Sequence, residues 1–378
     1  MSLWNKLRRR RTTAAAVLVF LTLIVTPYWA SPISPIAVRQ TPATPEKHVA
    51  DASFQEFELD HPYLEAVDVL PDGRVVFGTE TGLIFELPVG ALSPEASQEQ
   101  RPREIARLSG QSIGIAYDPD ADAYWSATFP VGLQRISSDG SVQDINLGLS
   151  EPVTFPDDVA IGPDGIIYMT EASTKYTPVT TAPNAPYVLW DFIEGRANGR
   201  LIAYDPSTDH ADVAIDALAF PSGVTVSPDG TALLIVEVSR NRVVRYELEG
   251  TGKGSLSVFA DGLPGIPDDV FVGPSGHVWV TLVAPRSGMM EDVVGRHPYL
   301  ARLISILPWR WQNAMLTPTE SGGALLMLDE QGTMQCERRL TQGFPPANGA
   351  VLGEELLLGR LGGHEFLLVD PSGCALAE

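Results

Sequence analysis

Four short segments of this chain place an oxygen-bearing side chain at the start of an apolar run. The segments are YLEAV around Glu65, FPDDVAI around Asp157 and Asp158, FPSGVTV around Ser222, and IPDDVFV around Asp268 and Asp269. Carboxylate and hydroxyl oxygens are hard ligands, and calcium is bound by several such oxygens at once. If the fold brings the four segments together, they predict a calcium site.

The same residues have a second interpretation. Asp and Ser after Pro are common turn residues, so an isolated Pro-Asp-Asp segment before a strand is typical of a solvated turn. The calcium hypothesis gains over the turn hypothesis only because the segments recur at equivalent positions of a repeat. Carboxylates crowded together without a cation would also raise one another's pKa values and lower stability.

A repeated pattern predicts where these segments lie. About six copies combine a short apolar run, a turn, a second apolar run and a more polar strand. The turns include Pro71-Asp72-Gly73, Asp118-Pro119-Asp120, Pro163-Asp164-Gly165, Pro228-Asp229-Gly230 and Pro274-Ser275-Gly276. Apolar runs around such turns indicate paired antiparallel strands, and this period predicts an all-β fold, a six-bladed β-propeller. The first strand of each blade lines the central channel, so the four segments are expected to meet near its axis.

The propeller is predicted to span residues 51–378, with insertions near 173–198 and 285–322, where the spacing between turns lengthens. Six blades account for about 320 residues, which leaves no second domain. The segment FQEFELDHPYLEAV (54–67) resembles the polar strand that ends a blade, although it precedes the first copy. We expect residues 54–59 to complete the last blade, because closing the ring in this way removes exposed sheet edges.

The first thirty residues differ from the rest. NKLRRRR leads into TTAAAVLVFLTLIVTPYW (12–29), an apolar run of nearly membrane-spanning length. Residues 1–30 predict a signal anchor or a signal peptide, and residues 31–50 a Pro-rich linker. Basic residues before the run place the propeller on the extracytoplasmic side. An uncleaved membrane anchor is favoured because Tyr28 lies where a peptidase requires a small side chain; the alternative is a secreted or periplasmic protein after cleavage.

The charge and the cysteine content indicate which partners are excluded and whether a disulfide is able to form. The chain has 47 acidic and 26 basic residues, a net charge of −21, and five of the positive charges lie in the first eleven residues. Such an acidic body repels polyphosphate, so no nucleic acid partner is expected. The two cysteines, Cys336 and Cys374, are able to form one disulfide in an exported domain. Two unpaired thiols are an equal alternative.

Several longer stretches resemble one family. They are GIIYMTEASTKY (165–176), DFIEGRANGRLIAYDPST (191–208), FPSGVTVSPDG (220–230), LPGIPDDVFVGPSGHVWV (263–280) and GMMEDVVGRHPYLARLISILPWRWQ (288–312). In this order they resemble the strictosidine synthase-like proteins, which belong with the gluconolactonase and paraoxonase six-bladed propellers. The resemblance runs from about residue 54 to the end of the chain.

The resemblance implies a ligand set. Calcium-dependent relatives use Glu, Asn, Asn and Asp from four inner strands, and the matching residues here are Glu65, Asp157, Ser222 and Asp268. Asp157 replaces an Asn by an anionic ligand, which should keep or strengthen binding. Ser222 replaces the other Asn by a shorter hydroxyl, so that a water would have to fill the gap. Calcium is therefore the expected cofactor.

At two positions the sequence differs from the family, and these differences limit which reactions are expected. The catalytic Glu of strictosidine synthase corresponds to about Asn348, which cannot act as a general base, so condensation of an amine with an aldehyde is not expected. The stretch GQSIGIAYD (110–118) has no counterpart of the paraoxonase His pair. The expectation is an arylesterase or lactonase that acts on a small-molecule ester or lactone, with the metal as Lewis acid and Asp158 and Asp269 as candidate catalytic bases. His61, four residues before Glu65, is a further candidate.

Two other functions remain open. A non-catalytic propeller would use a structural calcium and bind a partner, and a carbohydrate- or quinone-dependent dehydrogenase would need an Arg and His cluster that the inner strands lack. The insertion at 288–312 has apolar residues at helical spacing with three arginines and Trp309 and Trp311 at one end. It predicts an amphipathic helix that acts as a lid or contacts a membrane, or one that packs on the propeller rim.

Overall fold

The computed structural model describes residues 22, 25, 29–44, 49–52, 54–58, 64–92, 101–181, 185–316, 322–340 and 344–374. These residues divide into two compact units. Unit 1 combines Met1–Arg39, Ala182–Arg196 and Ser287–Thr317, and unit 2 contains the rest. In the part of the chain that the structure describes, no helix is long and apolar enough to cross a membrane. Most of the predicted signal segment at 1–30 lies outside that part.

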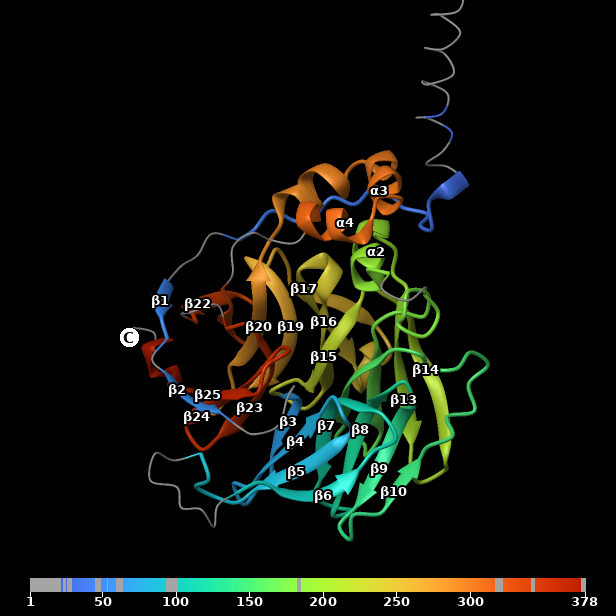
Figure 1. Ribbon diagram of the computed structural model, residues 1–378. Helices are drawn as coiled ribbons and strands as arrows, with labels where there is room; N and C mark the ends of the chain where they lie inside the picture. Colours follow the sequence, from blue (N-terminus) through green and yellow to red (C-terminus); the bar gives the residue numbers. More distant parts are fainter. Residues whose placement is uncertain are drawn as a thin grey trace, which may run out of the picture. The chain divides into compact units, whose positions relative to one another are not determined.

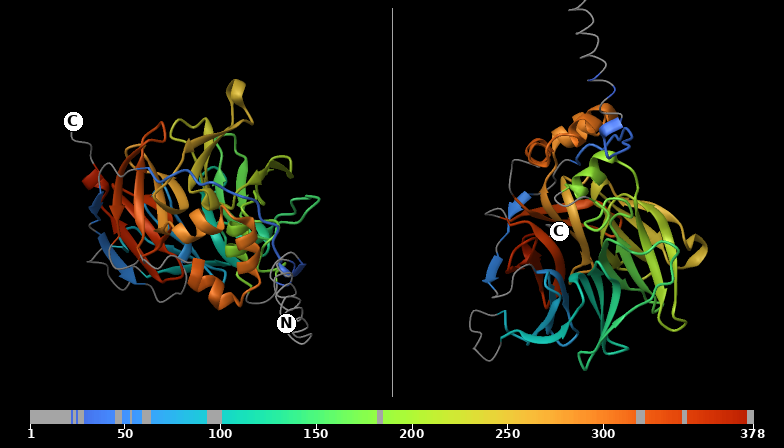
Figure 2. Two further views of the ribbon diagram at one scale, coloured as in Figure 1. Left: turned by 90° about the horizontal axis from the view of Figure 1, so that it is seen from above. Right: turned by 45° about the vertical axis from the view of Figure 1, so that its right-hand side comes forward.

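Unit 2 is a ring of six β-sheets, which confirms the predicted six-bladed propeller (Figures 1 and 2). Each blade has four antiparallel strands, and the first strands of neighbouring blades contact one another around the ring. Blade 1 consists of β3 (Leu64–Val69), β4 (Val75–Thr79), β5 (Leu83–Leu87) and β6 (Arg103–Arg107). Blade 2 consists of β7 (Gln111–Asp118), β8 (Ala123–Phe129), β9 (Gly132–Ser137) and β10 (Val142–Asp144). Blade 3 consists of β11 (Pro156–Ile161), β12 (Ile167–Glu171), β13 (Gly199–Asp205) and β14 (His210–Leu218). Blade 4 consists of β15 (Pro221–Val226), β16 (Ala232–Glu237), β17 (Arg242–Glu247) and β18 (Leu256–Ala260). Blade 5 consists of β19 (Gly265–Val272), β20 (Val278–Pro285), β21 (Ala324–Leu328) and β22 (Met334–Arg339). Blade 6 consists of β23 (Pro346–Leu352), β24 (Glu355–Arg360), β25 (Glu365–Val369) and β2 (Phe54–Glu58).

The ring closes as the sequence predicts. Strand β2 pairs antiparallel with β25, from Phe54 opposite Val369 to Glu58 opposite Glu365, so residues near the N-terminus complete the last blade. A short strand that was not predicted, β1 (Val49–Asp51), pairs parallel with β22 and gives blade 5 a fifth strand. Residues 49–58 are therefore built into the sheets of blades 5 and 6.

A disulfide fixes the C-terminal segment to blade 5. Cys336 of β22 is bonded to Cys374 of the short 3₁₀ helix η5 (Pro371–Cys374), with a Cα–Cα distance of 5.6 Å. Of the two alternatives that the sequence left open, the structure contains the disulfide.

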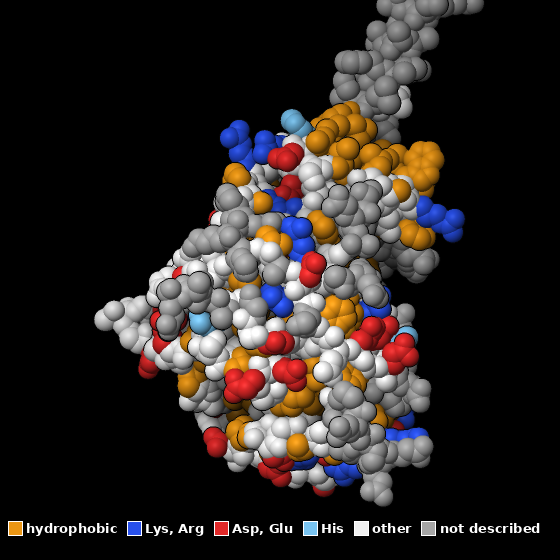
Figure 3. Space-filling view, turned by 90° about the vertical axis from the view of Figure 1, so that its left-hand side faces the viewer, with side chains coloured by type: hydrophobic (Ala, Val, Ile, Leu, Met, Phe, Trp, Pro, Cys, Tyr) orange, Lys and Arg blue, Asp and Glu red, His pale blue; other side chains and the backbone are white. Residues whose placement is uncertain are grey.

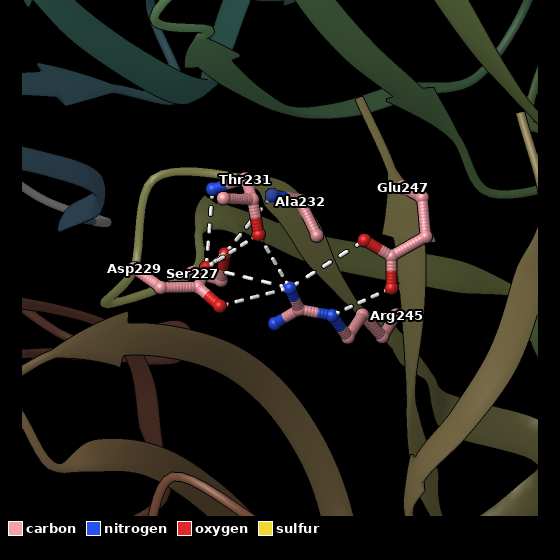
Figure 4. Close-up of polar contacts among 6 residues, drawn as sticks. All are labelled: Ser227, Asp229, Thr231, Ala232, Arg245 and Glu247. Carbon is pink, nitrogen blue, oxygen red and sulfur yellow. Dashed lines mark hydrogen bonds and ion pairs between the residues drawn. The ribbon is translucent and has the colours of Figure 1, made fainter. Parts of the chain in front are cut away.

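The predicted turns owe their shape to glycine and aspartate. Gly73, Gly165, Gly230 and Gly276 all have positive φ, between 72° and 86°, a conformation that glycine adopts without a Cβ clash. In blade 4, Asp229 Oδ1 accepts hydrogen bonds from the Thr231 N–H (3.1 Å) and the Ser227 hydroxyl (2.6 Å) (Figure 4). Arg245 donates from Nη2 to Asp229 Oδ2 (3.0 Å) and from Nε to Glu247 Oε1 (2.8 Å), which ties the turn to β17.

The hydrophobic core lies between neighbouring blades. Phe77 and Phe85 of blade 1 pack with Phe366 of blade 6, and the rings of Phe77 and Phe366 meet edge to face at 5.5 Å. Blades 2 and 3 meet around Trp125, and blades 5 and 6 around Trp279, each only 1–2% exposed. Because each sheet buries both faces, its strands read as nearly continuous apolar runs.

Unit 1 is assembled from segments far apart in the sequence. It contains α2 (Tyr187–Glu194), the π-helical turn η3 (Met289–Val294), α3 (Pro298–Ser305) and α4 (Trp309–Leu316). The 3₁₀ turns η1 (Val238–Arg240) and η2 (Gly250–Gly252) belong to unit 2. Within unit 1, Trp190 Nε1 donates to Gln312 Oε1 (2.9 Å), which joins α2 to α4. The two predicted insertions thus form one helical unit together with the segment that follows the apolar run.

Candidate functional site

All six inner strands carry a β-bulge at the same level. The bulges lie between Leu64 and Val67, Ser112 and Gly114, Pro156 and Val159, Pro221 and Val224, Pro267 and Val270, and Pro346 and Gly349. A bulge adds an unpaired residue and changes the direction of side chains near functional sites. The four predicted metal ligands and the candidate bases Asp158 and Asp269 all lie in these bulges.

Three of the four predicted metal ligands come together. The Ser222 hydroxyl donates to Asp157 Oδ1 at 2.7 Å and lies 3.4 Å from Asp268 Oδ1, so blades 3, 4 and 5 each contribute one oxygen. The fourth residue, Glu65, occupies the equivalent bulge position of β3, but its side chain lies outside the described residues. The candidate base His61 lies outside them as well.

The chemistry of this cluster suits a hard cation. Three oxygen donors from three blades converge, two of them carboxylates, and burial raises the pKa of Asp268 to about 6 although the Ser222 hydroxyl acts in the opposite direction. Among the described residues, no three His, Cys, Asp or Glu side chains form a metal-binding group. The cluster at Asp157, Ser222 and Asp268 has two carboxylates and a hydroxyl, and these oxygen donors are of the type that calcium binds.

The second aspartates, Asp158 and Asp269, connect neighbouring blades. Asp158 Oδ2 accepts a hydrogen bond from the Val224 N–H of the next inner strand (2.8 Å), and Asp269 Oδ2 accepts one from the Gly349 N–H (2.7 Å). Oδ1 of Asp269 also accepts the N–H of Val270 at 2.7 Å. These carboxylates fix the inner strands relative to one another, and their predicted role as catalytic bases stays a prediction.

A threonine supports each of these aspartates. The Thr170 hydroxyl accepts the Asp158 N–H (2.9 Å) and donates to the carbonyl oxygen of Ser222 (2.8 Å). In the same way, Thr281 accepts the Asp269 N–H and donates to the Ala347 carbonyl, both at 2.8 Å. Thr170 thus holds the backbone of Ser222 in the position from which its hydroxyl reaches Asp157.

Glycine makes room for the aspartates on the other side. A Cβ at Gly114 would lie 2.4 Å from Asp158 Oδ1, and a Cβ at Gly223 would lie 2.3 Å from Asp269 Oδ1. Each second aspartate is therefore enclosed by a glycine on the preceding blade and an N–H group on the following one. This arrangement explains why the bulge sequences Asp-Asp and Ser-Gly alternate around part of the ring.

A cavity of about 410 Å³ lies on the channel axis and is lined by all six inner strands. Its wall contains Asp158, Asp269 and Asn348, together with many aliphatic side chains. It also contains Asp68, which was not among the residues predicted from the sequence: Asp68 Oδ2 accepts the Tyr117 N–H at 2.8 Å and so joins blades 1 and 2. The signal for Asp68 was a single carboxylate inside the apolar run AVDVL.

Burial shifts the titration of these cavity carboxyls. It raises the pKa of Asp68 to about 6 and that of Asp158 to about 7, and neighbouring Asp68 and Asp268 add to the effect on Asp158. Burial, with a further contribution from Asp158, raises the pKa of Asp269 well above its usual range. Hydrogen bonds from backbone N–H groups act in the opposite direction but do not compensate for the loss of solvent.

Comparisons with known proteins agree with the geometry. A family model described as strictosidine synthase matches residues 157–251. Strictosidine synthase-like 2 of Arabidopsis thaliana is 30% identical over 279 residues, which are 71% of this chain and 69% of that protein. Strictosidine synthase-like 13 of Arabidopsis thaliana is 30% identical over 63% of this chain. The adipocyte plasma membrane-associated protein of Bos taurus is 30% identical over 61% of this chain. These last two matches span 60% and 58% of the relatives' lengths.

Solved structures share the fold at low sequence identity. A gluconolactonase from Xanthomonas campestris superposes with a TM-score of 0.58 at 14% identity and covers 89% of this chain and 98% of its own. Regucalcin from Agrobacterium tumefaciens, a calcium-binding protein, gives 0.57 at 16% identity, with 85% and 96% covered. The sequence matches supply the family and the structures supply the architecture: the chain belongs to the strictosidine synthase-like family of six-bladed β-propellers.

Proposed function

We propose that this protein is a calcium-dependent hydrolase of small-molecule esters or lactones, of the arylesterase or lactonase type. The observation that carries the proposal is the convergence of Asp157, Ser222 and Asp268 from three blades. With Glu65 from a fourth blade, these residues would hold the cation, which when bound supplies Lewis-acid polarisation of a carbonyl group. Two proteins of the same fold, a gluconolactonase and a calcium-binding protein, are consistent with it.

The chain's own residues would bind and orient the substrate. Two residues before Asp157 and Ser222 lie Phe155 and Phe220, whose rings meet edge to face at 5.8 Å. This aromatic pair suits an apolar or aromatic acyl group beside the oxygen cluster. Asp158 in the cavity wall would be the candidate base; burial raises the pKa of its carboxyl to about 7 when no cation is bound. Asn348 in the cavity wall has no such capacity, which supports hydrolysis over amine–aldehyde condensation.

A non-catalytic binding module with a structural calcium is the second candidate. The observation in its favour is that both oxygens of Asp269 and Oδ2 of Asp158 already accept backbone N–H groups. Hydrogen bonds from backbone N–H groups stabilise the charged form of these carboxylates and so oppose their protonation. On this reading the carboxylates stabilise the ring, and the channel face recognises a ligand.

An extracytoplasmic location, with the apolar run at 12–29 as anchor or cleaved signal, is part of the proposal. The Cys336–Cys374 disulfide supports it, because disulfides form and persist mainly in oxidising compartments outside the cytoplasm. The basic residues that precede the apolar run support the same orientation. One relative is named for its association with the plasma membrane.

The test measures calcium content together with phenyl acetate and lactone hydrolysis, with and without a chelator. The variants are Asp268→Asn and Glu65→Ala. Asp120→Asn is the matched control, since this exposed aspartate lies in the turn between β7 and β8. We expect one bound calcium, chelator-sensitive turnover in the wild type and in Asp120→Asn, and the loss of both binding and turnover in the two ligand variants.

The outcomes separate the two candidates. Turnover that persists in Asp268→Asn would exclude the proposed mechanism. Calcium that binds through Asp157, Ser222 and Asp268 without hydrolysis of any ester or lactone would establish the binding module instead. A panel of acyl chain lengths and ring sizes is needed in this experiment, because the loops at the channel mouth determine which substrate fits.

A further inference from the structure

Exposed hydrophobic side chains are concentrated in unit 1. Among the described residues, fifteen large hydrophobic side chains are exposed, and nine of them belong to unit 1, although this unit is much the smaller of the two. Figure 3 shows hydrophobic side chains gathered over this helical part. Monomeric soluble proteins rarely expose such a concentration unless it binds a partner or a membrane.

The exposed side chains follow from how α4 is held. Gln312 and Leu316 are buried, and Gln312 Nε2 donates to the Leu307 carbonyl at 2.7 Å. Trp311 and Met315 precede these two residues by one position, so they share the adjacent face of the helix and are 63% and 42% exposed. The inward face of α4 is therefore already occupied within unit 1, and its tryptophan-bearing face is left exposed.

Other exposed apolar residues extend this surface. Met289 and Val293 of η3 are 46% and 39% exposed, and Trp309 at the start of α4 is 44% exposed with the guanidinium of Arg310 5.6 Å from its ring centre. Tryptophan and arginine side by side are typical of the interface between water and lipid, where an apolar ring and a cation are both accommodated. We call the exposed residues of η3 and α4, Met289, Val293, Trp309, Trp311 and Met315, the apolar face.

Charge distinguishes unit 1 from the rest of the molecule. After the apolar run at 12–29, its sequence contains five basic and four acidic residues, whereas the whole chain has 26 and 47. An anionic lipid surface would repel the acidic propeller but not this nearly neutral part of unit 1. The basic residues include Arg310 of α4, which carries part of the apolar face, Arg302 of α3, and Arg296 after η3, which is ion-paired with Asp292 at 2.7 Å.

The chain itself connects this unit to the apolar run at 12–29. Trp29, the last residue of that run, is 86% exposed. Two residues later, the Ser31 hydroxyl lies 2.9 Å from the Ser305 hydroxyl of α3, and further on Val38 N–H donates to the Gly295 carbonyl (2.8 Å) and Ser34 N–H to Glu194 Oε1 (2.6 Å). The segment that leaves the apolar run is thus fixed to α2, α3 and the end of η3.

From these observations we infer that unit 1 binds the surface of an anionic lipid bilayer through the apolar face. The apolar side chains enter the headgroup and acyl-chain boundary, and the arginines pair with the phosphates and carboxylates of the headgroups. This surface acts in addition to any anchor formed by residues 12–29. It does not depend on the chemistry of the propeller channel, so it stands or falls separately from the proposed hydrolase.

The test uses the full-length protein reconstituted into phosphatidylcholine bilayers, with and without phosphatidylserine, whose acyl chains carry bromine as a quencher. An environment-sensitive fluorophore is attached to Met315→Cys or, as the matched control, to Val258→Cys on β18 of the propeller, which is 51% exposed. Both native cysteines are held in the disulfide, so the label reacts with the introduced thiol. We expect strong quenching at position 315, stronger with phosphatidylserine, and none at position 258.

A second variant separates docking from simple tethering. Trp311→Ser with Met289→Ser in the Met315→Cys background alters only exposed side chains, and we expect it to lose most of the quenching while the fold is kept. Quenching that is unchanged in this variant would mean that the anchor alone sets the position, and the inference would be wrong. A label at 315 that is shielded in crosslinkable dimers but not quenched by brominated lipid would also overturn it and assign the apolar face to a second copy of the chain.

Discussion

At the scale of single residues, the candidate site depends on what fits beside each aspartate. Gly223 lies next to Asp269, and a Cβ added there would also approach the Asp269 Cα at 2.6 Å, which is closer than real contacts allow. Asp269 cannot withdraw, because its two carboxylate oxygens accept N–H groups from Val270 and Gly349. The strand that carries Ser222 would have to move instead, and with it the ligand cluster.

We therefore expect Gly223→Ala to lower the free energy of unfolding by about 1–3 kcal/mol, as overpacking of a tight interior does. It should also weaken calcium binding, because Ser222 precedes the substituted residue. Gly322→Ala is the control, since a Cβ at Gly322 meets nothing, and its effect should stay within about 0.5 kcal/mol. Urea unfolding and calcium titration measure the two quantities; equal behaviour of the two variants would contradict the account.

At the scale of elements, the ring is closed by one strand from the beginning of the chain. Phe57 of β2 lies opposite Phe366 of β25 and packs against the cluster between blades 1 and 6, whereas its neighbour Glu56 is exposed. Phe57→Ala should lower the free energy of unfolding by about 1–3 kcal/mol, less than a fully buried Phe because Phe57 is only half-buried. Glu56→Ala on the same strand should change it by less than about 0.5 kcal/mol. Comparable losses in both variants would show that backbone pairing, not side-chain packing, carries the closure.

The Cys336–Cys374 disulfide also stabilises the C-terminal part of the ring. It closes a loop of 38 residues between Cys336 and Cys374, for which chain entropy gives a stabilisation of about 3–4 kcal/mol. A reducing agent should lower the denaturant midpoint of the wild type to that of Cys336→Ser with Cys374→Ser. The double variant is its own control, since the reagent should leave its midpoint unchanged; a wild type insensitive to reduction would contradict the expected contribution.

The sequence was most informative where a structural signal is local. The Pro-Asp-Gly turns, the apolar runs and the polar strand at 54–58 each specify an element from a few neighbouring residues, which is why six blades and their closure were predictable. Equivalent bulge positions likewise brought Asp157, Ser222 and Asp268 together as expected. Strand β1 has three residues and no pattern of its own, so only its pairing with β22 reveals it. The joining of residues 31–38 to helices more than 150 positions away depends on long-range packing that no local pattern encodes.

At the scale of the whole molecule, the charge of the ring connects stability to pH and calcium. The chain carries a net charge of −21, and the carboxyls of Asp68, Asp158 and Asp268 meet near the channel axis. Burial raises the pKa of Asp68 and Asp268 to about 6 and that of Asp158 to about 7, against 3.8 for an ordinary aspartate. Between pH 4 and pH 7, the folded protein without calcium therefore holds protons that the unfolded chain has released.

Unfolding releases these protons, so the free energy of unfolding of the chelated protein should fall as the pH rises from about 4 through about 7. Calcium requires the deprotonated carboxylates, and it stabilises the folded state by mass action. Its stabilising effect should consequently grow over the same pH range. Thermal unfolding with chelator and with calcium at pH 5, 6, 7 and 8 measures both trends. Asp268→Asn should flatten the chelated profile and remove the calcium effect, because one titrating ligand is gone; a calcium effect independent of pH in the wild type would mean that the ion binds away from the channel carboxyls.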